Sequence, residues 1–118
     1  MRFSLVLAAG LFIFIATQAF GVAADSLTRN LRVGDRGEDV RLLQEFLNQD
    51  TRTRVSVAGP GSLGNETDFF GFLTQKAVKA FQELYSDEVL VPVGLNRGTG
   101  FAGPMTRAKI NALSEAQR

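Results

Sequence analysis

Apolar residues recur at helical spacing in three segments of the chain, which predicts three amphipathic helices. The stripes consist of Val40, Leu43, Phe46 and Leu47, then Ala77, Val78, Phe81 and Leu84 or Tyr85, and then Met105, Ile110 and Leu113. We expect these side chains to face a single core. The stretches between the stripes carry many glycines and no helical period. The pattern therefore predicts an all-α fold, a small three-helix bundle with long glycine-rich connecting loops.

The starts of the predicted helices carry their own signals. Asp35 is a candidate cap for the first helix, and Glu38 follows at the spacing of a capping box. Thr74 is the candidate cap of the second helix. Pro104 opens the third helix, at a first-turn position where proline is tolerated.

The connecting segments contain short patterns as well. Residues 54–57 alternate between polar and apolar, so a short extended or hairpin segment is one interpretation of the connection between the first two helices. Residues 58–65 are predicted to be a loop from their composition. Residues 89–92 are predicted to be extended, and the glycines that follow supply turns before the third helix.

Two short phrases occur twice in the chain. Residues 40–47 and 78–85 share the order valine, base, apolar, large apolar, glutamine, glutamate, apolar, apolar. Residues 71–74 and 103–106 share a glycine and, at the end, a threonine. An echo at a fixed offset suggests two copies of one helical unit packed together.

Residues 1–24 differ in composition from the rest. The charge of Arg2 precedes an almost wholly apolar stretch from Phe3 to Ala16, and small residues at 21–24 offer a cleavage site. This is the form of a secretory signal peptide. An uncleaved membrane anchor is the alternative, because the apolar stretch is nearly long enough to span a bilayer. Both interpretations predict export to the periplasm, cell wall or extracellular space, with 25–32 as a linker and 33–115 as the domain.

The composition excludes several classes of function. The chain carries 13 Lys or Arg and 12 Asp or Glu, and Arg2 is the one charged residue before Asp25, so the remainder is neutral. A neutral domain offers no electrostatic footprint for nucleic acid. The chain has no cysteine and no histidine, which removes the usual zinc sites and the serine and cysteine hydrolase mechanisms. We therefore expect no enzyme activity, no metal and no cofactor.

Glycines, glutamines, threonines and apolar residues of the three units form a recognisable set. In order they are Leu31, Gly34, Gly37, Val40, Leu43, Gln44 and Leu47, then Phe70, Gly71, Thr74, Ala77, Val78, Phe81 and Gln82, then Gly103 and Thr106. This set resembles the peptidoglycan-binding domain found on many bacterial cell-wall enzymes. The resemblance covers residue 31 to about residue 113.

The resemblance implies a bundle of three helices, a bacterial source and attachment to the cell wall. The chain departs from the family pattern in two longer loops, at 58–67 and 94–100. Members of the family are usually joined to an amidase, transpeptidase or peptidase domain. This chain ends soon after the third helix, so we expect it to act alone or beside a separate cell-wall enzyme or envelope protein.

The residues of these units and loops divide into an expected scaffold and a candidate site. Phe70 and Phe81 are expected in the core, and Gln44 and Gln82 are expected to satisfy backbone groups of nearby glycine turns. Nine side chains in or beside the long loops are the candidate ligand contacts: Asn65, Glu66, Thr67, Asp68, Phe69, Phe72, Arg97, Thr99 and Arg107.

Each group of candidates has a functional and a structural interpretation. The polar residues at 65–68 can hydrogen-bond an N-acetyl group or a stem-peptide amide, or can serve as caps and turn formers. The two phenylalanines offer a platform for a saccharide or peptide. The arginines can pair with a stem-peptide carboxylate, or are solvated surface charges.

The primary hypothesis is thus an exported, non-catalytic module that binds peptidoglycan, through glycan or stem peptide. The alternative is an envelope protein-interaction or structural module that keeps the fold without binding the wall. Contact with a membrane is expected only if the N-terminal segment is uncleaved.

Overall fold

The computed structural model describes residues 26–118, so the predicted signal peptide at 1–24 lies outside the described part. The elements are α2 (Glu38–Asn48), α3 (Phe72–Leu84), α4 (Ser86–Val89), the 3-10 helix η1 (Val91–Val93) and α5 (Pro104–Ala116). Within 26–118 there is no strand, only three isolated bridges. The predicted all-α class is therefore confirmed. No helix in this range has the length and apolar character needed to cross a membrane.

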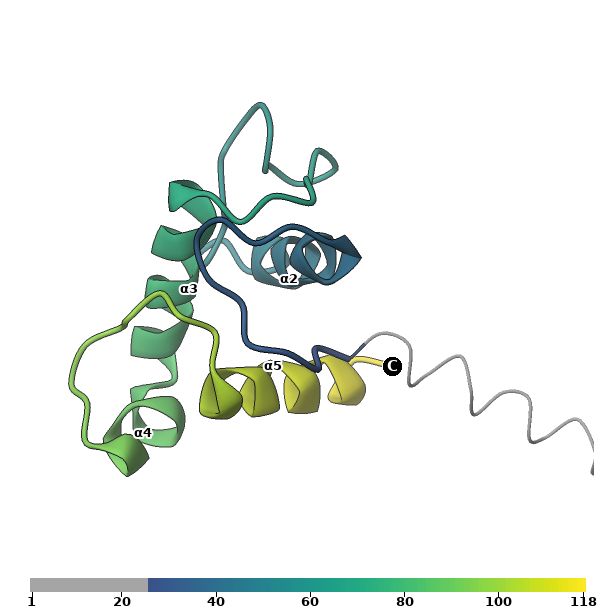
Figure 1. Ribbon diagram of the computed structural model, residues 1–118. Coiled ribbons are helices and arrows are strands. Elements are labelled where there is room, and N and C mark those ends of the chain that lie inside the picture. The colour runs from purple at the N-terminus through teal and green to yellow at the C-terminus, as the bar shows by residue number, and fades with distance from the viewer. Residues whose placement is uncertain (1–25) are drawn as a thin grey trace, which may run out of the picture.

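Helix α3 connects the two ends of the domain (Figure 1). It stands as a column, with α2 beside its first half and α5 beside its second half. The loop between α2 and α3 projects at one end, and the loop after η1 returns along the other side to reach α5. The two long loops therefore lie at different places on the molecule.

The predicted stripes supply most of the core. Val40, Leu43 and Leu47 on α2 are fully buried. On α3, Val78 is fully buried and Phe81 is 1% exposed. Phe70 is also completely buried, as predicted. The stripe of α5 is only partly right: Ile110 is 2% exposed, but Met105 is 37% exposed because it lies in the first turn of the helix, beside a groove.

The segment predicted as a linker is an extended arm packed on the domain. Leu27 and Leu31 are buried in the core. Asn111 on α5 holds both backbone groups of Leu27: its Oδ1 accepts from the N–H at 2.9 Å, and its Nδ2 donates to the carbonyl at 3.0 Å. Leu31 pairs with Ala102 in an antiparallel bridge. The arm is therefore anchored to α5 at Leu27 and to the loop before α5 at Leu31.

The predicted side-chain caps are wrong. Helices α2 and α3 begin after Gly37 and Gly71, and neither has a side-chain cap bond. The carboxylate of Asp35 accepts instead from the N–H of Arg32 at 2.9 Å, within the preceding turn. Thr74 lies inside α3, where its hydroxyl is occupied by a core glutamine. Proline at the start of α5 is confirmed.

Two predicted extended segments also differ from the structure. Residues 89–92 are not extended, because α4 and η1 occupy this region. Val89 and Leu90 are both buried, which consecutive residues of a strand cannot achieve against one surface, since they point to opposite faces. Residues 54–57 form no strand, and only Ser56 makes a bridge, to Ser62.

Candidate functional site

Gln44 holds the end of the first long loop against α3. Its side chain is 1% exposed. Its Oε1 accepts from the N–H of Thr67 at 2.6 Å, and its Nε2 donates to the carbonyl of Phe69 at 3.0 Å and to the hydroxyl of Thr74 at 2.9 Å. A buried amide is satisfied only when both its donor and acceptor sides are used. The predicted structural role of this glutamine is confirmed.

Gln82 makes the equivalent bonds one unit later and accepts from one additional backbone N–H. Its Oε1 accepts from the N–H groups of Thr99 at 2.7 Å and Gly100 at 3.0 Å. Its Nε2 donates to the carbonyl of Phe101 at 2.9 Å and to the hydroxyl of Thr106 at 3.0 Å. The two glutamines thus fasten two equivalent loop ends to the helices that follow them.

These bonds show that the second repeated phrase extends beyond its glycine and final threonine. The order threonine, any, phenylalanine, any, glycine, two of any kind, threonine occurs at 67–74 and again at 99–106. This longer repeat is visible in the sequence itself. Positions shared between the copies form the scaffold, so positions that differ are the better candidates for function.

A groove of 370 Å³ lies at the first copy, between the loop after α2 and the first turn of α3. It is lined by Arg36, Gln44, Val55, Pro60, Gly61, Thr67, Asp68, Phe69, Gly71, Phe72, Leu73 and Thr74. Four of the nine predicted contacts, at 67, 68, 69 and 72, therefore meet in one place. A concave site with apolar walls and a few polar groups is the usual form of a small-ligand site.

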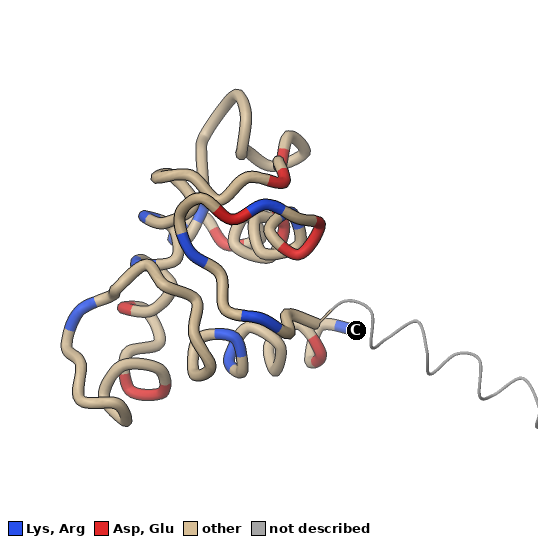
Figure 2. Tube along the Cα trace, in the orientation of Figure 1, with Lys and Arg blue, Asp and Glu red and all other residues tan. Residues whose placement is uncertain are grey.

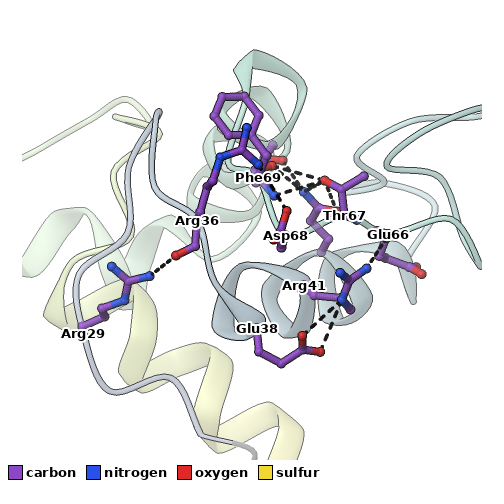
Figure 3. Close-up of polar contacts among 10 residues, drawn as sticks. Arg29, Arg36, Glu38, Arg41, Glu66, Thr67, Asp68 and Phe69 are labelled. Carbon is purple, nitrogen blue, oxygen red and sulfur yellow. Dashed lines mark hydrogen bonds and ion pairs between the residues drawn. The ribbon is translucent and has the colours of Figure 1, made fainter.

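Arg36 organises one wall of this groove (Figure 3). Its guanidinium carbon lies 4.5 Å from the centre of the Phe69 ring, and its Nη1 lies 3.3 Å from Oδ1 of Asp68. The side chains of Arg36 and Asp68 are 66% and 49% exposed, so this ion pair is only weakly held. Both retain hydrogen-bonding capacity that faces solvent.

Phe69 is partly used by the scaffold, whereas Phe72 is not. The Phe69 ring has arginine over it and packs so close to Gly71 that a Cβ there would lie 3.2 Å from the ring. Phe72 is 76% exposed at the first position of α3, and Leu73 beside it is 53% exposed. A large aromatic residue this exposed leaves a ring face free for contact.

Asn65 and Glu66 do not line the groove, and their side chains make hydrogen bonds that stabilise the loop between α2 and α3. The Nδ2 of Asn65 donates to Ser62 Oγ at 3.1 Å. The carboxylate of Glu66 accepts from Asn48 Nδ2 at 2.8 Å and from the N–H of Gly64 at 3.1 Å. Burial acts to raise the pKa of Glu66, but these hydrogen bonds outweigh it and hold the pKa below its ordinary value.

The other three predicted contacts lie elsewhere. Thr99 lines a second, smaller groove of 120 Å³ at the second copy of the repeat. Arg107 donates to Asn30 Oδ1 at 2.9 Å, across to the arm. Arg97 is exposed on the loop before α5. The predicted set therefore does not converge on a single cleft.

The two grooves can be compared position by position, because they lie at the two copies of the repeat. Its ring, Phe101, is covered by Arg32 at 4.8 Å, as Phe69 is covered by Arg36. The position equivalent to Phe72 is Pro104, and the position equivalent to Asp68 is Gly100. Because the second unit folds without an aromatic ring or a carboxylate at these positions, the scaffold does not require them. Phe72 and Asp68 are thus the least structural members of the candidate site.

Sequence reasoning missed the contributions of Arg36 and Asn48. Arg36 reaches the groove from the turn before α2, and no local pattern marks a contact with residues so distant in the chain. Asn48 is 1% exposed and holds the loop through its bonds to Val55 N at 2.9 Å and Gly61 O at 3.0 Å. The sequence signal for this role was the position of Asn48, an asparagine that directly follows Leu47 of the apolar stripe.

The groove contains few charged groups. Its charged groups are one guanidinium and one carboxylate, paired with each other. In the part of the chain that the structure describes, no three acidic residues gather in a way that could hold a metal ion.

No family model matches the chain, and no match was found among curated proteins or solved structures.

Proposed function

We propose that this protein is an exported, non-catalytic module that binds peptidoglycan in the bacterial cell envelope. The observation that carries the proposal is the groove at the start of α3, where the exposed Phe72 lies beside the weakly paired Arg36 and Asp68. The resemblance of the glycine, glutamine and threonine set to the peptidoglycan-binding family supports it. On this proposal the three long helices α2, α3 and α5 correspond to the three helices of that family's bundle.

The groove suits a ligand that combines apolar ring faces with amides. The free face of Phe72 can pack against the C–H face of a sugar ring. The carboxylate of Asp68 can accept from an N-acetyl or stem-peptide N–H, while Arg36 can donate to a carbonyl or carboxylate. Because the ion pair between them is exposed, its exchange for ligand contacts costs little.

The test is sedimentation with purified bacterial sacculi. The full-length chain is mixed with sacculi, centrifuged and quantified in pellet and supernatant, with a spin of the protein alone as the blank. Phe72→Ala should weaken binding by about fivefold or more, since truncating a central aromatic contact costs about 1 kcal/mol or more. The variant should unfold at the same denaturant concentration as the parent, because Phe72 is 76% exposed.

Val91→Ala is the matched control. Val91 is an exposed apolar residue of η1, 59% accessible and outside the lining of the groove, so its removal should leave sacculus binding unchanged. An equal loss in both variants would indicate nonspecific adhesion and contradict the proposal. A parent protein that stays in the supernatant at low and moderate salt would refute it, in favour of an envelope protein-interaction module.

A further inference from the structure

Unpaired positive charge is concentrated on one side of the molecule. Most basic side chains in 26–118 meet a carboxylate, a carbonyl, an amide or an aromatic ring. Four of them make no such contact and are exposed: Arg54, Lys76, Lys79 and Arg97. All four belong to α3 or to the loops beside it, and the charged residues in the first two turns of α3 are all basic (Figure 2).

Two of these residues line a further groove, which borders the one at the start of α3 and shares Val55 and Leu73 with it. It has a volume of 550 Å³ and lies between residues 51–58 and the exposed face of α3. Its lining is Thr51, Arg52, Arg54, Val55, Ser56, Val57, Ala58, Leu73, Lys76, Ala77 and Ala80. Every charged residue in this lining is basic, and Arg52 alone is neutralised, by Asp50 at 2.7 Å.

The groove also presents apolar surface to solvent. Val57 is 90% exposed on one wall, and Leu73 is 53% exposed on the other. Ala77 and Ala80 on α3 also belong to the lining. Small residues at these positions leave the volume open, so the groove combines an apolar floor with a cationic rim.

The positive surface continues beyond the groove. Lys79 lies one helical turn after Lys76, and the backbone of Gly98 packs so closely on Lys79 that a Cβ at Gly98 would lie 2.6 Å from its carbonyl oxygen. Arg97 therefore lies at the edge of the same face. The carboxylate at this end, Glu83, is held by the N–H of Gly98 at 3.0 Å.

We propose that this α3 groove docks an extended acidic peptide segment of a partner protein. Apolar side chains of the segment would pack between Val57 and Leu73, and its carboxylates would pair with Arg54, Lys76 and Lys79. The apolar floor favours a peptide over a phosphate polymer, which would leave that surface exposed. Complementary charge and buried apolar contact together give register and affinity.

Fluorescence anisotropy of the full-length chain tests the proposal directly. The probe is a fluorescein-labelled peptide of alternating glutamate and leucine, and the comparison probe replaces each glutamate by lysine. We expect saturable binding of the acidic probe that weakens as salt is raised, and none of the basic probe. Lys76→Glu and Arg54→Glu should each weaken binding by about tenfold or more, whereas Arg118→Glu, beyond the C-terminal end of α5, should have no effect.

Further measurements distinguish the acidic peptide from other anionic ligands of the groove. Inorganic polyphosphate or vesicles with anionic headgroups that bind as tightly as the acidic peptide would overturn the proposal in favour of a general anion surface. Absence of binding, or binding that Lys76→Glu leaves unchanged, would also overturn it. Lys76 lies outside the groove at the start of α3, so its variant should still sediment with sacculi. Failure of peptide docking is thereby distinguished from failure of wall binding.

Discussion

Replacing the buried glutamines by leucine tests whether the two repeated units are fastened by their side-chain amides. Leucine fills similar volume but offers no hydrogen bond. In Gln82→Leu, the N–H groups of Thr99 and Gly100 lose their acceptor and the carbonyl of Phe101 loses a donor. A buried polar group left without a partner costs about 1–3 kcal/mol. Since Gly100 is buried while Thr99 is exposed, we expect a loss of about 2–4 kcal/mol.

The equivalent change in the first unit should cost less. Gln44 accepts from only one backbone N–H, that of the half-buried Thr67, so Gln44→Leu should lose about 1–2 kcal/mol. Either loss is a large share of the stability of a small domain, which is about 5–15 kcal/mol. The difference between the two variants follows directly from the number of backbone donors that each amide satisfies.

Urea unfolding followed by circular dichroism measures these losses. The midpoint should shift while the slope with denaturant stays constant, because the surface exposed on unfolding is unchanged. Gln49→Leu is the control: Gln49 is exposed and its side chain makes a single 3.3 Å bond to a neighbouring carbonyl. The reasoning is refuted if Gln44→Leu and Gln82→Leu each lose less than about 0.5 kcal/mol, or no more than the control.

Three further changes test other parts of the structure. Gly100→Ala should destabilise more than Gly94→Ala: both have positive φ, but only at Gly100 would a Cβ meet Gln75, at 2.5 Å, and equal midpoints in urea would contradict this. Folding stability should fall as pH drops below the ordinary value of 4.5 for Glu66, because its pKa is lowered in the folded state and the unfolded chain binds the proton first. Glu66→Gln should flatten that part of the pH profile measured by thermal unfolding, and an unchanged slope would remove Glu66 as its source. Asn48→Leu should increase amide hydrogen exchange in residues 55–66, since it removes the bonds that anchor this loop, and unchanged protection there would contradict the anchoring role.

Much of the scaffold could be predicted from the sequence because it depends on local periodicity. The stripes of α2 and α3 placed Val40, Leu43, Val78 and Phe81 correctly in the core. Helical spacing forces such residues onto one face, and that face must be buried. The helix starts were predicted less well, because side-chain caps were expected where glycines begin the helices. The carboxylate and hydroxyl expected to cap them are used in other bonds.

The candidate site was only partly predictable. Its loop residues at 67–69 and its exposed phenylalanine at 72 follow one another closely in the chain, so their proximity was visible. The approach of Arg36 to Phe69 was not, because it depends on how the turn before α2 packs on the start of α3. The separation of Arg97 and Arg107 from this groove was not predictable either, because it depends on how the second loop and α5 pack against α3 and the arm.

The sequence by itself determined the helical units, the apolar core and the two glutamine-bearing repeats, because these depend on spacing along the chain. Tertiary structure alone decided which loop residues meet. The extended arm at 26–32 joins the core, the two copies of the repeat form two unequal grooves, and four unpaired basic residues gather beside α3. Such surfaces arise from contacts between residues distant in sequence, whose positions are set by packing and leave no periodic trace in the chain.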